Sequence, residues 1–364
     1  MSSNSRKWLL LGLFAAIAAL LLYRFRTALH LRESWDAARN ADSRYLLAAV
    51  ALIYICYFLR AVRWQQLQKH VGNAPLLPIF SMTLAGFSAV YLFARLGEPV
   101  RPMLLSRKCK VPLADIFGIY ALERFIDMLF AGAILAVWFL LTTAERGANP
   151  ALEPVRKTAG TILTIGAICV AGLIVYVWSH GAVMIEGRLE SWQAASGSRA
   201  SIARIVLGII RGFKTIKSWR DFTIVLGISI VHWFLIVVVY QLVEVGFGGK
   251  LAILRLQDSA LIVALTMVGS LLQLPGIGGG PQAVMTGAFT QFYQVPSETG
   301  FAAAMVIFLI TFGVGSVVGA PVLFKEGFSL GQLRRMREQE DQEIDGKMLA
   351  HPTPEAPQSA KAEN

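Results

Sequence analysis

Charged residues, acidic ones above all, and cysteine are scarce in this chain of 364 residues. Asp, Glu, Lys and Arg make up 16% of the chain, where soluble proteins have about 25%, and 55% of the residues are hydrophobic. The three cysteines form no CxxC pair, so the sequence predicts neither a disulfide framework nor a metal site. No Gly-Lys-Ser or Gly-Lys-Thr follows the glycine-rich residues 276–280, which excludes a P-loop, and the sequence predicts no cofactor.

Apolar residues, by contrast, form eight long runs. A helix needs about 20 residues to cross the hydrocarbon core of a bilayer, and several of the runs reach that length. The runs are residues 8–23, 45–59, 76–93, 113–141, 158–178, 222–245, 259–274 and 297–324. The mean hydropathy of +0.57 agrees with this pattern. The sequence therefore predicts an all-α, polytopic membrane bundle rather than water-soluble domains.

Two of these runs end in helix-breaking sequence. The breaks at residues 94–99 and 275–281 contain glycine and proline, and each is followed by a short helical stretch, residues 100–107 and 282–294. Non-helical backbone at membrane depth is tolerated only where protein or water satisfies its polar groups. We therefore expect two re-entrant hairpins, related as inverted repeats, together with about six full spanning helices.

Basic residues outnumber acidic ones, for a net charge of +11. In a membrane protein the anionic lipid surface explains this excess, so no nucleic-acid partner is expected. If the N-terminus is cytoplasmic and each hairpin returns to its own side, the inside segments, residues 60–75 among them, hold 19 Lys and Arg and the outside segments hold 10. This bias predicts a location in the cytoplasmic (inner) membrane with both termini in the cytoplasm.

The same topology divides the chain into one membrane domain and a tail. Residues 1–324 form the membrane domain, and residues 179–221 within it are a basic amphipathic cytoplasmic loop. That loop suits either the anionic inner leaflet or packing on the bundle. Residues 325–364 are predicted to be a cytoplasmic tail, and we expect most of it to be disordered, because beyond Arg337 it is acidic and rich in proline, alanine and glutamine.

Six charged residues cluster around the first break and in the next apolar run. They are Arg95, Glu98, Arg101, Glu123, Arg124 and Asp127. A charge at the bilayer centre costs about 2.5 to 3.5 kcal/mol, so these side chains must face one another or water. One interpretation is a site in which the guanidiniums bind the phosphate of a lipid headgroup. The other is a buried network that fixes how the first hairpin docks, and both interpretations stay open.

The two breaks themselves supply further candidate substrate-binding residues. Glycines allow close approach of the backbone and expose amide groups, and a polar side chain follows the second glycine motif. The candidates are Gly97, Gly276, Gly278, Gly279, Gly280 and Gln282.

Four short segments carry a resemblance to a known family. Residues 59–64, 94–101, 122–127 and 274–278 resemble the transmembrane region of lysylphosphatidylglycerol synthases, the flippase half of the multiple peptide resistance factor. The resemblance covers most of residues 8–324 and implies translocation of a lipid between leaflets. In this family a Glu usually follows the second glycine motif, where this chain has Gln282.

Three functions are compatible with these patterns. The first, which we expect, is the flipping of an anionic phospholipid or a polyprenyl-linked lipid, so that membrane lipids are the partners and no reaction is catalysed. The second is a membrane-embedded transferase that acts on a lipid-linked substrate. The third is a non-catalytic partner of a separately encoded lipid synthase or glycosyltransferase.

Overall fold

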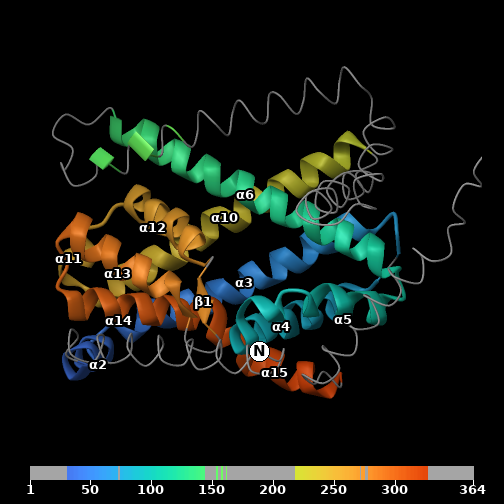
Figure 1. Cartoon of the computed structure of the whole chain (residues 1–364), viewed down its shortest axis with the longest axis horizontal. Coiled ribbons are helices and arrows are strands. Elements are labelled where there is room, and N and C mark those ends of the chain that lie inside the picture. The colour runs from blue at the N-terminus through green and yellow to red at the C-terminus, as the bar shows by residue number, and fades with distance from the viewer. Residues whose placement is uncertain are drawn as a thin grey trace, which may run out of the picture.

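The protein is a bundle of helices, as its apolar runs predict (Figure 1). The computed structural model describes residues 31–72, 74–143, 153–154, 157–158, 161, 218–270, 272–274 and 278–326. The long helices are α3 (Ser43–Gln68), α4 (Leu76–Phe93), α6 (Leu113–Thr143) and α10 (Trp219–Phe247). The shorter ones are α2 (Leu31–Arg39), α5 (Val100–Cys109), α11 (Gly249–Ala252), α12 (Leu256–Gly269), α13 (Gly280–Tyr293), α14 (Ser297–Phe308) and α15 (Val314–Lys325).

Four helical segments in the described part of the chain are long and apolar enough to cross a membrane. They are Ser43–Gln68, Leu76–Gly97, Trp219–Phe247 and Ser297–Lys325. The predicted span at residues 113–141 forms the 31-residue helix α6, which is not among these four. The predicted spans at residues 8–23 and 158–178 lie outside the described residues, except for Thr158 and Thr161. The loop predicted to be cytoplasmic, apart from residues 218–221, and the tail after residue 326 lie outside them as well.

Helix α4 ends at the first predicted break, and the chain folds back. A short 3-10 turn, η1 (Ala94–Gly97), joins α4 to α5, and the backbone of Ala94 has a φ of 52°, which non-glycine residues rarely adopt. A Cβ at Gly97 would lie 2.1 Å from the carbonyl oxygen of Ala89 on α4. The turn is therefore pressed against the helix that precedes it, and only glycine fits there.

The second predicted break forms a similar turn between α12 and α13. Two short antiparallel strands, β1 (Gln273–Leu274) and β2 (Gly278–Gly279), pair Gln273 with Gly279. The amide of Gly280 donates a hydrogen bond of 2.8 Å to the carbonyl oxygen of Leu272. Helix α12 ends at Gly269, five residues before the end of the predicted run, because the chain has already entered this turn.

The two helical hairpins lie at opposite ends of a frame of long helices. Figure 1 shows α3 and α10 running through the molecule with α6 across them, the second hairpin with α14 on the left and the first hairpin with α15 on the lower right. Helix α3 packs against α10 and α4, and α6 contacts both α12 and α5. The two turns approach one another, since β1 contacts η1.

The buried apolar side chains form two main clusters that share α3. One contains Ile53 and Tyr57 on α3 and continues into α10 and α12–α14. The other contains Ala61 and Trp64 on the same helix and continues into α4, α5 and α6. Large apolar side chains on α3, α10 and α15 are exposed, as expected for helices that face lipid. On α3 the two clusters meet between Tyr57, which belongs to the first, and Ala61, which belongs to the second.

The last span contains one wide turn. Helices α14 and α15 are joined by η3 (Leu309–Gly313), which is π-helical, so its backbone is locally wider than an α-helix. Two tyrosines of α3 hydrogen-bond to carbonyl oxygens at this turn. Tyr57 donates to Thr311 over 2.5 Å, and Tyr54 donates to Val314 over 3.0 Å.

Helix α3 is longer than the sequence predicts. We predicted an apolar run that ends at residue 59 and a cytoplasmic loop from residue 60, but α3 continues to Gln68. Arg60 and Arg63 lie in the added turns and are buried rather than exposed to cytoplasm. This prediction was wrong because the arginines were assigned to water, whereas acidic partners on α6 compensate them inside the bundle.

We expect Gly97→Ala to destabilise the protein by about 1 to 3 kcal/mol, because its Cβ would overlap the Ala89 carbonyl group. Gly132→Ala is the matched control: Gly132 lies within helix α6, and a Cβ there would meet no atom within 4 Å. Alanine at position 132 should leave stability unchanged or raise it slightly. Denaturant-induced unfolding of the purified proteins in micelles measures both. Equal unfolding midpoints for the two variants would contradict the tight turn.

Candidate functional site

Helix α6 places two carboxylates inside the bundle. Glu123 and Asp127 are four residues apart and therefore share one face of the helix. Glu123 is fully buried and Asp127 is 3% exposed. Arg124 lies beside them, and its Nη2 is 2.9 Å from Asp127 and 3.5 Å from Glu123. A pair of acids at this depth requires cations, which come from neighbouring helices.

Helix α3 supplies two of these cations. The Nη2 atom of Arg63 lies 2.8 Å from Glu123 and 3.0 Å from Asp127, so one guanidinium bridges both acids. Arg60, one turn earlier, is 3.4 Å from Glu123 and 3.6 Å from Asp127. The indole N–H of Trp64 also donates to Glu123. The i, i+3, i+4 spacing of the three α3 residues directs them all toward α6.

The first hairpin supplies a third cation, Arg101, at the second residue of α5. Its Nη1 donates to Glu123 over 3.0 Å, and its guanidinium lies 4.5 Å from the ring centre of Trp64. A Cβ at Gly86 on α4 would lie 2.4 Å from the Cβ of Arg101. Glycine at position 86 therefore lets α5 come close enough to α4 for Arg101 to reach the acids.

Helix α10 completes the surroundings of the α3 arginines. The Nη1 of Arg63 donates to the hydroxyl of Ser229 over 3.2 Å, and the Nη2 of Arg60 lies 3.2 Å from the Nε2 of His232. Both α10 side chains are buried. We name the residues Arg60, Arg63, Arg101, Glu123, Arg124 and Asp127 the charged cluster.

The charged cluster has more positive than negative groups. Its four guanidiniums face two carboxylates, an excess of two positive charges. Within the described residues, the Nε and Nη2 atoms of Arg101 and the Nε atoms of Arg60 and Arg124 are buried and have no hydrogen-bond partner. Buried donors without partners are costly, and a cationic site with spare donors is suited to an anion.

A cavity of about 130 Å³ opens beside the charged cluster. It lies where the turns of the two hairpins meet, and its walls come from α3, α4, α5, α6, η3 and the second hairpin. Its lining residues are Arg60, Gly86, Phe87, Val90, Glu98, Arg101, Tyr120, Arg124, Ser270, Gln273 and Phe312. Three of the four guanidiniums thus reach one space. Tyr120 donates over 3.1 Å to Glu98, the acidic side chain on the wall.

The structure brings most of the charged residues predicted for the site together. Arg101, Glu123, Arg124 and Asp127 belong to the charged cluster, and Glu98 lies on the cavity wall. Arg95 is different: it is exposed, and its Nη2 lies 3.5 Å from the Ser270 carbonyl oxygen. We predicted Arg95 to lie within the cluster, but the 3-10 turn directs it outward and toward the second hairpin.

The predicted glycines and Gln282 do not line the cavity. Gly97, Gly278, Gly279 and Gly280 form the turns that shape the hairpins, and Gln282 is buried in α13. Gly276 lies outside the described residues. Within the described residues, no group of three or more His, Cys, Asp and Glu side chains could hold a metal ion.

The sequence prediction missed several residues of the site, among them Arg60, Arg63 and Tyr120. The two arginines lie in the segment 59–64 that carries the family resemblance, so a signal was present. Their three-residue spacing continues the helical pattern of α3, but the end of the apolar run at residue 59 outweighed it. Tyr120 is three residues from Glu123 and carries no signal of its own.

These features define a multi-pass helical membrane protein with an arginine-rich cluster buried between helical hairpins. The chain belongs to the family described as Lysylphosphatidylglycerol synthase TM region, whose model matches residues 9–319. It is 22% identical over 315 residues to a UPF0104 membrane protein of Methanothermobacter thermautotrophicus strain Delta H, an alignment that covers 82% of this chain and 90% of that protein. No solved structure matches the chain significantly.

We expect Asp127→Asn to lower the free energy of unfolding by about 3 to 5 kcal/mol. The change is nearly isosteric, but it removes a counter-charge and raises the positive excess of the charged cluster from two to three. Glu326→Gln is the control, because its ion pair with Lys108 is exposed to solvent and should contribute less than about 1 kcal/mol. Unfolding by denaturant in micelles measures both. A loss for Asp127→Asn no larger than that for Glu326→Gln would show that the buried ion pairs do not hold the helices.

Proposed function

We propose that the protein translocates an anionic lipid between the leaflets of the cytoplasmic membrane. The observation that carries this proposal is the excess of guanidiniums at a cavity between two helical hairpins. A phosphate in that cavity would accept hydrogen bonds from guanidinium donors that have no partner among the described residues. Membership of the family supports a role in lipid modification or transport.

The two hairpins are proposed to be re-entrant, each entering the membrane and returning to its own side. The turn of each hairpin lies next to the other, and both contribute to the cavity wall. Such an arrangement gives a polar space near the midplane where a headgroup is shielded from hydrocarbon. In this proposal the apolar chains of the lipid stay in the bilayer while its headgroup passes between the hairpins.

The orientation is proposed from the distribution of basic residues. Burial of Arg60 and Arg63 removes two residues from the 19 assigned to the cytoplasmic side, but the bias over the 10 outside residues remains. Both termini are therefore proposed to be cytoplasmic. On this topology the first hairpin opens from the cytoplasm and the second from the other side.

The proposed mechanism is an exchange of partners within the charged cluster. Glu123 now accepts from Arg63 and Arg101, and Asp127 accepts from Arg63 and Arg124. A phosphate that binds Arg101 and Arg124 would replace part of these contacts without leaving a buried charge uncompensated. Arg63, held between both acids and Ser229, would stay in place and keep α3 on α6.

We expect Arg101→Gln to reduce lipid scrambling by about tenfold or more, because it removes a guanidinium from the cavity and each such charged hydrogen bond contributes about 1.5 to 3 kcal/mol. Proteoliposomes with acyl-labelled phosphatidylglycerol or a labelled polyprenyl phosphate measure the rate through dithionite quenching. Arg107→Gln is the control, since it removes an exposed cation from the other end of α5.

The same vesicles separate transport from the alternatives. Wild-type rates in Arg101→Gln would remove the assigned role of the charged cluster. Rates in wild-type vesicles that equal those of protein-free vesicles would contradict translocation of these lipids. A covalently altered lipid, detected by mass spectrometry of the vesicle extract, would indicate a membrane-embedded transferase instead.

A further inference from the structure

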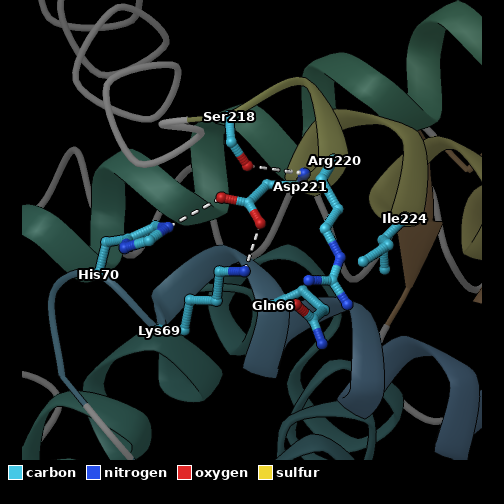
Figure 2. A pocket seen from close by; sticks show the side chains of 7 residues that line it. All are labelled: Gln66, Lys69, His70, Ser218, Arg220, Asp221 and Ile224. Carbon is cyan, nitrogen blue, oxygen red and sulfur yellow. Dashed lines mark hydrogen bonds and ion pairs between the residues drawn. The ribbon is translucent and has the colours of Figure 1, made fainter.

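A second pocket, separate from the central cavity, lies where the end of α3 meets the beginning of α10. It has a volume of about 480 Å³ and is lined mainly by polar side chains (Figure 2). Lys69 and His70 come from the end of α3, and Ser218, Arg220 and Asp221 come from the beginning of α10. Since α3 extends about 1.5 Å per residue, Lys69 is about 9 Å along the helix from Arg63.

Asp221 is held in this pocket by hydrogen bonds with residues from the ends of both helices that form it. Its Oδ1 accepts from the Nζ of Lys69, and its Oδ2 lies 2.8 Å from the Nε2 of His70. Its backbone N–H donates to the hydroxyl of Ser218 over 3.2 Å, which caps α10. The side chain of Asp221 is almost completely buried. Both carboxylate oxygens are therefore held by α3, and they tie the two helices together.

The side chain of Arg220 takes no part in these hydrogen bonds of Asp221. Figure 2 shows its side chain extending toward Gln66, which also lines the pocket, while Asp221 points to Lys69 and His70. Among the described residues no hydrogen bond or ion pair engages Arg220. Lys69 and Arg220 together exceed the charge of Asp221 by one, and the first N–H groups of the 29-residue helix α10 lie alongside. A guanidinium, an ammonium group and a helix N-terminus around one pocket favour an anion with several oxygens.

The pocket lies at the level expected for lipid headgroups. Both helices that form it, Ser43–Gln68 and Trp219–Phe247, are long and apolar enough to cross a membrane, and the pocket is at their ends. Trp219, next to Arg220, is 79% exposed and stacks on Phe222 with 5.1 Å between ring centres. Exposed tryptophans at the ends of spans are typical of the membrane–water boundary.

We propose that this pocket is a phosphate-binding site at the membrane surface, with Arg220 as its main ligand and Lys69 and Gln66 beside it. The phosphate belongs either to a lipid headgroup of the adjacent leaflet or to a soluble phosphate ester, which share the same chemistry. Asp221 positions Lys69 and takes no part in binding. The site is independent of the central cavity and of the flipping proposed for it.

The test titrates the purified full-length protein, in neutral micelles, with two probes by calorimetry. One probe is inorganic phosphate, and the other is short-chain phosphatidylglycerol. We expect Arg220→Gln to weaken binding of at least one probe by about tenfold, and Arg220→Lys to restore part of it. Binding of phosphatidylglycerol alone would assign the site to a lipid headgroup, and binding of both probes would assign it to phosphate in general.

Two controls keep the outcome specific. Arg107→Gln removes an exposed cation near the end of α5 and should change binding less than twofold. The ends of α3 and α5 lie close together, since a Cβ at Gly72 would lie 2.4 Å from the Cγ2 of Val111. Arg101→Gln alters the central cavity and should leave the Arg220-dependent binding intact. Thermal unfolding of Arg220→Gln without probe should match wild type, because Arg220 has no described partner. Equal binding by wild type and Arg220→Gln, no binding of either probe, or loss of all binding in Arg101→Gln would overturn the proposal.

Discussion

The architecture depends on compensation of charge in a place where water cannot provide it. Glu123 is fully buried, and it accepts hydrogen bonds from side chains of α3 and α5. Taking such a group out of water costs several kcal/mol unless partners of opposite charge and good geometry surround it. Arg63 meets this requirement for Glu123 and Asp127 at once. The ion pairs therefore join α3, α5 and α6 inside the bundle.

The first hairpin is built around the same requirement. Glycine at positions 86 and 97 brings α5 and the turn against α4, and this places Arg101 over Trp64 and within reach of Glu123. The cluster nevertheless retains an excess of positive charge and buried guanidinium donors without partners. This excess of guanidiniums beside the cavity is the observation on which the proposed binding of an anionic headgroup rests.

Much of the fold could be predicted from the sequence, because glycine, proline and long apolar runs act locally. The helix end at Phe93 was predicted from such a break, and the sequence also identified Arg101, Glu123, Arg124 and Asp127. The end of α12 at Gly269 was not predicted, because the run of apolar residues continues to Leu274. The extension of α3 could not be predicted from its own residues, because Arg63 is stable inside the bundle only through acids 60 and 64 residues later. The direction of Arg95 depends on the backbone of the turn, which the residue pattern does not specify.

The π-helical turn at Leu309–Gly313 separates two halves of one span that pack against different helices. An α-helix advances about 100° per residue, so the extra residue in a π turn offsets the angular phase of everything after it by that amount. On the two sides of this turn, helix α14 packs against α13 and helix α15 packs against α4. Phe312, on the cavity wall, lies within the turn itself. Removing a single residue from this turn would rotate α15 relative to α14 and move the Phe312 ring away from the cavity wall. The number of residues in the turn is therefore constrained as well as their identity.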